Sequence, residues 1–192
     1  MKLLLHICCA PCALMPVEQL RAGAGEALGY FYNPNIHPYQ EHERRLSALR
    51  EWAVAACLPL LAEDYDPVPW LRRVAFREKD RCSLCYEMRL RRSAARARQL
   101  GAEAFSSTLL YSIYQNREQL VAAGRRAGRE WEVEFLEYDF RPLWALGQAK
   151  ARELQLYRQP YCGCIFSEAE RYMKKKLPLS MAKGEFDAGQ PS

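Results

Sequence analysis

The pattern that most constrains the fold is an alternation of short apolar segments with longer segments of helical periodicity. The short segments are rich in apolar and aromatic residues, as strands are, and they comprise residues 2–7, 28–32, 58–61, 104–109 and 133–138. Helical spacing occurs between and after them, at residues 16–21, 39–57, 82–100, 116–129, 146–156 and 166–176, with Pro16 in the first turn of the first helix. This order predicts an α/β fold with a parallel sheet covered by helices on both faces.

The length and composition favour a single folded unit. A chain of 192 residues is close to the usual size of one domain. Hydrophobic residues make up 49% and charged residues 27%, which is ordinary globular composition and excludes a disordered chain. We therefore expect one α/β catalytic domain over residues 1–180. Residues 181–192 are polar and contain Gly and Pro, which predicts a flexible tail.

The N-terminal sequence indicates the cellular compartment of the protein. The apolar run before Cys8 is too short for a signal peptide. No stretch approaches the roughly 18 consecutive apolar residues of a membrane span. We therefore expect a cytoplasmic protein without a membrane partner. Thiols stay reduced in the cytosol, so eight cysteines indicate metal ligands or catalytic groups rather than disulfides.

Seven of the cysteines fall into three clusters. The first cluster follows the first predicted strand, and sites in open parallel sheets lie beyond the carboxyl ends of the strands. The second pair has helical spacing, which places both sulfurs on one face. In the third pair, Gly163 allows a tight turn that points both thiolates the same way. The clusters are Cys8-Cys9-Ala10-Pro11-Cys12, Cys82-Ser83-Leu84-Cys85 and Cys162-Gly163-Cys164.

Seven thiolates exceed the four ligands of one zinc ion or one iron–sulfur cluster. The excess indicates two metal centres, or cysteines that take part directly in chemistry. Two simpler readings remain open at this point, namely a structural zinc site and a thioredoxin-like redox pair at Cys9 and Cys12. Cys57 stands apart on an apolar helix face, and we expect it to be a small core residue.

The charge is concentrated in one segment. The net charge is +5, but residues 72–98 contain ten basic and three acidic residues and carry +7. Such a stripe suits a polyanion such as RNA, and Arg92 and Arg96 would lie on one helix face. The alternative is a solvated helix surface that is rich in arginine because arginine favours helices.

Five strings of the sequence resemble the QueH family of epoxyqueuosine reductases. They occur in the family's order and span roughly residues 3–175. The strings are LLHICCAPC (4–12), YFYNPNIHP (30–38), RCSLCYEMRL (81–90), DFR (139–141) and QPYCGCIFS (159–167). One departure is Gln115, where the family pattern leads us to expect a lysine.

The resemblance implies a fold and an activity. The fold is a Rossmann-like three-layer sandwich of the adenine-nucleotide hydrolase-like class, with a cysteine loop in place of the phosphate-binding loop. The activity is reduction of the epoxide of epoxyqueuosine to queuosine at the wobble position of tRNA, without cobalamin. The implied cofactors are a [4Fe-4S] cluster and one additional iron ion. The partners are the anticodon loop that carries epoxyqueuosine and an unidentified electron donor.

The resemblance also suggests roles for residues. We expect the cluster to be bound by Cys8, Cys9, Cys82, Cys85, Cys162 and Cys164, with Cys12 as a seventh metal ligand. Removal of an epoxide oxygen as water needs two protons, and the candidate donors are, in decreasing order, Asp139, His6 and Tyr32. Alternatively, Asp139 pairs with Arg141 or ligates iron, and His6 is a core histidine.

The sequence is also compatible with a second function. A zinc-stabilised RNA-binding module without redox activity would use the same cysteines and the same basic segment. Tyr32 and Tyr39 are candidates for stacking on bases, and His37 either orders its loop or contacts RNA. An iron–sulfur protein would be brown and a zinc protein colourless, so purified protein distinguishes the two.

Overall fold

Five parallel strands form one sheet in the order β3-β2-β1-β4-β5. The structure is a computed structural model that describes residues 2–23 and 26–173. The strands are β1 (Lys2–His6), β2 (Glu26–Phe31), β3 (Leu60–Ala62), β4 (Ala104–Ser107) and β5 (Glu134–Phe135). The predicted α/β fold with a parallel sheet is confirmed.

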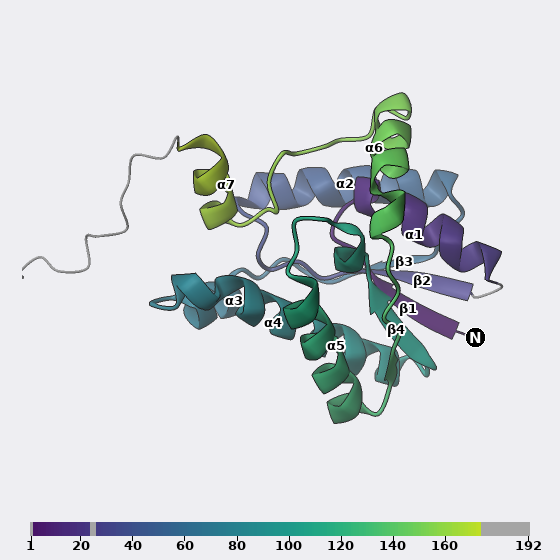
Figure 1. Cartoon of the computed structure of the whole chain (residues 1–192), viewed down its shortest axis with the longest axis horizontal. Coiled ribbons are helices and arrows are strands. Elements are labelled where there is room, and N and C mark those ends of the chain that lie inside the picture. Colours follow the sequence, from purple (N-terminus) through teal and green to yellow (C-terminus); the bar gives the residue numbers. More distant parts are fainter. Residues whose placement is uncertain (1, 24–25, 174–192) are drawn as a thin grey trace, which may run out of the picture.

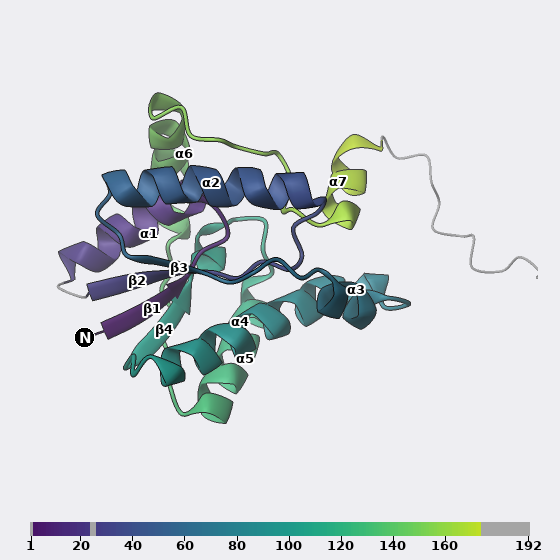
Figure 2. The same cartoon turned by 180° about the vertical axis from the view of Figure 1, so that it is seen from behind.

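Helices cover both faces of the sheet (Figures 1 and 2). Helices α1, α2 and α6 lie on one face, and α4 and α5 pack together on the other. The helices are α1 (Ala10–Ala22), α2 (Tyr39–Ala55), α3 (Val68–Val74), α4 (Arg81–Gln99), α5 (Arg117–Trp131), α6 (Trp144–Glu153) and α7 (Ile165–Tyr172). Short 3-10 turns lie at η1 (Glu78–Asp80), η2 (Thr108–Tyr111) and η3 (Arg141–Leu143).

The central strands are buried on both sides. Leu3, Leu4 and Leu5 of β1 are at most 1% exposed, and Phe105 of β4 is fully buried. A strand with helices above and below has no solvent face, so consecutive residues are apolar instead of alternating. This is why the N-terminal strand reads as a continuous apolar run.

The strand order creates a switch point between β1 and β4. From β1 the chain continues to β2 on one side, whereas β4 leads to β5 on the other. The connections diverge at the carboxyl ends of these two strands, which is where open α/β sheets bind ligands. The amide of Cys8 donates to Oγ1 of Thr108 across this point, at 3.2 Å. The expectation that the first cysteine cluster follows the end of β1 is confirmed.

The start of α1 and the presence of α3 differ from the sequence prediction, and both helices contain proline. Helix α1 begins at Ala10, with Pro11 in its first turn, so the prediction that Pro16 opens it was wrong. Proline in the first turn removes an N–H that has no helical partner anyway. Helix α3 was missed because Pro67 and Pro69 flank its first residue and read as a turn signal.

The last strand and the last helix are shorter than the sequence predicts. Of residues 133–138, only Glu134 and Phe135 pair in the sheet, at its edge. Helix α7 ends at Tyr172, and residues 174–176 of the predicted helix lie outside the described residues. So do residues 181–192, the predicted tail. Among the described residues, no helix has both the length and the apolar character of a membrane span.

Cys57 is not a core residue, which corrects the sequence prediction. Helix α2 ends at Ala55, and Cys57 adopts a left-handed φ of 48° on the surface. The turn directs Leu58 into the core instead, where it is 5% exposed. The apolar helical pattern therefore extended two residues beyond the real helix.

Helix α5 approaches the sheet edge through a glycine, and this contact gives a testable prediction. A Cβ at Gly124 would lie 2.3 Å from the ring of Phe135, which packs on Phe105 with ring centroids 5.1 Å apart. We expect Gly124→Ala to lower the free energy of unfolding by about 1–2 kcal/mol, because overpacking outweighs the gain of about 1 kcal/mol in helix propensity.

Urea denaturation measures this change, with Gly23→Ala as the control. A Cβ at Gly23 would meet no atom closer than 3.5 Å, so that variant should be at least as stable as the parent. A Gly124→Ala protein at least as stable as the parent would contradict the predicted steric conflict.

Candidate metal centre at the carboxyl edge of the sheet

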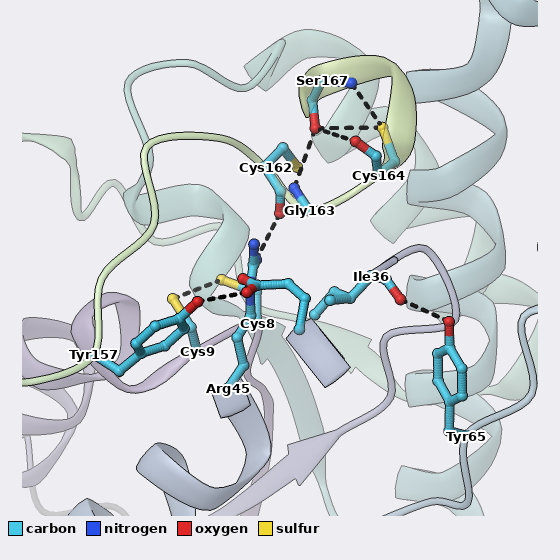
Figure 3. Close-up of polar contacts among 11 residues, drawn as sticks. Cys8, Cys9, Ile36, Arg45, Tyr65, Tyr157, Cys162, Gly163, Cys164 and Ser167 are labelled. Atoms are coloured by element: carbon cyan, nitrogen blue, oxygen red, sulfur yellow. Dashed lines mark hydrogen bonds and ion pairs between the residues drawn. The ribbon is translucent and has the colours of Figure 1, made fainter. Parts of the chain in front are cut away.

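Three thiols converge directly after β1. The Sγ atoms of Cys8, Cys9 and Cys12 all lie within 4.8 Å of one another, and those of Cys8 and Cys9 are 3.8 Å apart. Cys9 is the N-cap of α1, and Cys12 lies in its first turn. The strand-to-helix turn therefore brings the three side chains together. We call these residues the thiol triad; two of its sulfurs are visible in Figure 3.

The thiols of the triad differ in their pKa values. Hydrogen bonds from the Cys12 and Cys9 thiols hold the pKa of Cys8 well below its usual range, and Arg89 and Thr108 act in the same direction. The same hydrogen bond to Cys8 raises the pKa of Cys12. Cys8 is therefore favoured as a thiolate, stabilised by its protonated neighbours. Thiolates are the form in which cysteine binds metal, and metal binding releases the remaining protons.

A second group of thiols comes from α4 and from the loop before α7. Cys85 and Cys164 are buried together with Trp70 and Val74, whereas Cys82 and Cys162 are exposed residues. Desolvation raises the pKa of Cys82 and Cys85. All eight cysteines of the chain are free thiols. We call Cys82, Cys85, Cys162 and Cys164 the second thiol group.

The loop that carries Cys162 and Cys164 is held against α2 (Figure 3). Nη1 of Arg45 donates to the carbonyl of Cys162 at 2.8 Å, and the amide of His37 donates to the carbonyl of Gly163 at 2.9 Å. Gly163 has a φ of 133°, and a Cβ there would lie 2.9 Å from Arg45 Nη1. Glycine is thus required by conformation and by space, as the sequence indicated.

Arg89 lies between the two sets of thiols and was not identified from the sequence. It is 1% exposed. Its Nη1 lies 3.9 Å from Sγ of Cys85, and Nη2 donates to Oδ1 of Asn33 at 2.6 Å. Its charge interacts with Cys85, Cys8 and Cys162. The available signal was its spacing of one helical turn from Cys85.

His6 is a buried histidine at the end of β1. Nδ1 lies 2.8 Å from Oγ of Ser107, and Nε2 lies 3.2 Å from the carbonyl oxygen of Tyr32. Burial and the nearby charge of Arg89 lower its pKa to about 3. His6 is therefore neutral at physiological pH, and no acidic proton is available on its ring.

Tyr32 and Asp139 have different surroundings. Tyr32 is half-buried beside Tyr30, and burial raises its pKa, so its hydroxyl keeps its proton. The Asp139 carboxylate is paired with the Arg141 guanidinium at 2.6 Å, and this lowers the pKa of Asp139 to about 2. Asp139 lines a shallow hollow together with Met15, Glu18, Gln19, Pro142 and Leu143.

The low pKa of His6 predicts a pH dependence of stability. The folded value of about 3 lies below the unfolded value of about 6.5. The unfolded chain therefore binds the extra proton between these values, and stability present above pH 6.5 is lost as the pH falls toward 3. For the metal-free protein, we expect a loss on the order of 1 kcal/mol per pH unit from this residue.

Urea denaturation of the metal-free protein across this pH range, without oxygen, measures the effect. His6→Gln should reduce the slope because the group that takes up the proton is gone. Equal slopes for parent and variant would show that His6 does not govern acid sensitivity.

Comparison with known proteins places the chain in a family. Residues 3–170 match the family model described as "Epoxyqueuosine reductase QueH". The chain is 36% identical to the epoxyqueuosine reductase QueH of Dehalococcoides mccartyi over 92% of this chain and 98% of that protein. It is 34% identical to that of Thermotoga maritima over 94% and 97%, and 37% identical to that of Helicobacter pylori over 93% and 53%. The chain belongs to the epoxyqueuosine reductase QueH family.

Proposed function

We propose that this epoxyqueuosine reductase acts on tRNA through a [4Fe-4S] cluster and one additional iron ion, without cobalamin. The observation that carries the proposal is that seven free thiols come from three segments, with the thiol triad at the switch point of the sheet. The buried cation of Arg89 interacts with thiols of both groups, namely Cys8, Cys85 and Cys162. We also infer that the sheet and its helices belong to the adenine-nucleotide hydrolase-like class. Membership of a reductase family favours this reading over a zinc-stabilised RNA-binding module.

The donor set fits such a cofactor. Soft thiolates select iron–sulfur clusters, zinc or Cu(I), and the free thiols here outnumber the four ligands of a single centre. The second thiol group is partly buried among Trp70, Val74 and Phe166, an apolar setting that restricts water. Two centres therefore account for the number of thiols better than one.

The spacing of the thiols suggests which group holds which metal. A tetrahedral ion with metal–sulfur bonds of about 2.3 Å has ligand sulfurs about 3.8 Å apart, and Cys8 and Cys9 have this separation. In the described part of the chain, the thiol triad is the only such tight group of three or more ligands. A four-iron cluster is larger and needs more widely spaced thiolates. We assign the second thiol group to the cluster and the triad to the additional iron.

The reaction sets what the protein must supply. Reduction of an epoxide to an alkene breaks two C–O bonds, consumes two electrons and two protons, and releases water. The metal centre supplies one-electron transfer and a Lewis acid for the oxygen. Of the three expected proton donors, only Tyr32 keeps its ionisable proton at neutral pH, so we place it first. Asp139 serves better as a metal ligand or as an ion-pair partner of Arg141.

The ion pairs reduce the number of basic residues in this segment that are available to contact tRNA. Six of its arginines pair with carboxylates, and Arg89 is buried; the six are Arg73, Arg81, Arg91, Arg92, Arg96 and Arg98. The other three, Arg72, Arg77 and Lys79, are exposed and have no ion pair among residues 2–23 and 26–173. Arg72 lies in the last turn of α3, and Arg77 and Lys79 lie between α3 and Cys82. We call residues 72–79 the α3–α4 turn.

The α3–α4 turn also presents an aromatic ring. Phe76 is 98% exposed. Its acidic neighbours are Glu78, which accepts from the Phe76 amide, and Asp80. An exposed ring beside cations suits an unstacked base of a single-stranded loop. Tyr39, at 57% exposure, remains a candidate for the same role, whereas Tyr30 and Tyr111 are buried in the core.

Metal analysis of cysteine variants tests the proposed cofactor. Serine in place of Cys82, Cys85, Cys162 or Cys164 should reduce both iron and acid-labile sulfide, because a hydroxyl is a poor substitute for thiolate. Serine at a triad position should lower iron by about one ion per chain and leave sulfide intact. Both are measured on protein purified without oxygen.

Cys57→Ser is the matched control, because Cys57 is exposed and distant in sequence from the three clusters. Its iron and sulfide should equal the parent's. Zinc without sulfide in the parent would reject the iron–sulfur proposal, and loss of sulfide in the triad variants would reject the division of the thiols.

Salt dependence of tRNA binding tests the α3–α4 turn. Each phosphate contact adds about 0.7–0.9 to the slope of log affinity against log salt. Replacing Arg72, Arg77 and Lys79 together by Gln should therefore flatten the slope. The same change at Arg91, Arg92 and Arg96, which already pair with carboxylates, should have the smaller effect. The reverse order would place the tRNA on the outer face of α4.

A further inference from the structure

Arg89 is a buried cation held in a fixed position. It lies one turn after Cys85 on α4 and is 1% exposed. Nη2 donates to Oδ1 of Asn33 at 2.6 Å, and Nε lies 3.4 Å from Nε2 of His6. Asn33 is itself 2% exposed and donates through Nδ2 to the carbonyl of Ile7 at 2.9 Å. The guanidinium is thereby tied to the end of β1.

No carboxylate neutralises this charge within the described ranges of the chain. The other buried arginine, Arg45, pairs with Glu41 at 2.7 Å, and Arg91 and Arg98 on the same helix as Arg89 pair with glutamates. A buried charge without a counter-ion is strongly unfavourable. The groups near Arg89 that can carry negative charge are the thiols of Cys8, Cys85 and Cys162.

Both sets of thiols therefore share one counter-cation. Cys8 belongs to the thiol triad, and Cys85 and Cys162 belong to the second thiol group. A thiolate-bound cluster becomes more negative by one charge when it accepts one electron. A fixed positive charge stabilises the reduced form more than the oxidised form, and net charge and hydrogen bonds to sulfur are known determinants of cluster potential.

We propose that Arg89 is the built-in counter-cation of the metal centre and raises the reduction potential of its cluster. The proposal rests on the iron–sulfur cofactor of the proposed function. Arg89 is on this view a positioning and tuning residue that acts through the thiolates and does not touch the substrate. Asn33 is its anchor, because it fixes the guanidinium without neutralising it.

Two substitutions remove the charge effect by different routes. Arg89→Gln deletes the cation, and Asn33→Asp keeps the oxygen that accepts from Arg89 but adds a neutralising negative charge. Arg89→Lys keeps the positive charge but loses the planar guanidinium group and its paired N–H donors. Arg98→Gln is the control, because Arg98 is exposed, lies on the same helix and pairs with Glu132.

The experiment is a potentiometric titration of the purified holoproteins with dithionite as one-electron donor, followed by electron paramagnetic resonance. At the parent's midpoint, we expect Arg89→Gln and Asn33→Asp to lower the ratio of reduced to oxidised cluster at least tenfold, a shift of about 59 mV for a one-electron couple. Arg89→Lys should fall between them and the parent. Arg98→Gln should match the parent, with equal iron and sulfide.

The outcomes separate the two proposals. A parent protein without iron and sulfide would reject the proposed cofactor. Full clusters with unchanged midpoints in Arg89→Gln and Asn33→Asp would overturn the role of Arg89 alone. If Arg89→Gln does not assemble a cluster, Asn33→Asp decides by its midpoint. Loss of the cluster in all three site variants, with the metal-free proteins still folded, would show a purely structural role and also overturn the proposal.

Discussion

The buried guanidinium of Arg89 links the segments on which the site depends. It comes from α4, is fixed by Asn33 after β2, and interacts with thiols that follow β1, begin α4 and precede α7. Without negative thiolates around it, this charge would be isolated in a desolvated site. The thiols, in turn, have raised pKa values at Cys82 and Cys85 because of the same desolvation. The charge of Arg89 opposes that shift at Cys85, so the cation and this thiolate favour each other's charged forms. Metal binding completes that balance.

The sheet explains why these segments meet. Strands β1 and β4 are neighbours whose connections leave in opposite directions, so their carboxyl ends open a gap that neither connection covers. The thiol triad occupies this gap, and Thr108, the first residue of η2 after β4, closes it from the other side. In many proteins of this architecture, the first turn of the helix after β1 binds an anion through its amides. Here the same turn carries three sulfurs, one of which, Cys8, is favoured as an anion.

The ion pairs show how a charge count differs from a charged surface. Residues 72–98 carry +7 in the sequence. In the structure, however, Glu63 forms ion pairs with Arg92 and Arg96, and Glu87 forms ion pairs with Arg73 and Arg126. Glu63 follows β3, far from α4 in the chain, so the sequence alone gave no indication of this neutralisation. The cations left over gather at the α3–α4 turn, next to Cys82.

The sequence by itself determined the α/β class, the position of the first cysteine cluster after β1, and the grouping of the cysteines, because these follow from local periodicity and short spacings. It misjudged Cys57, the start of α1 and the extent of β5, since helix ends and edge strands depend on packing that no local pattern records. Only the tertiary structure decided that Arg89 faces the thiols and that Asp139 pairs with Arg141. Arg89 and Cys8 are 81 positions apart, and their electrostatic contact exists only once the sheet order has placed α4 against the end of β1.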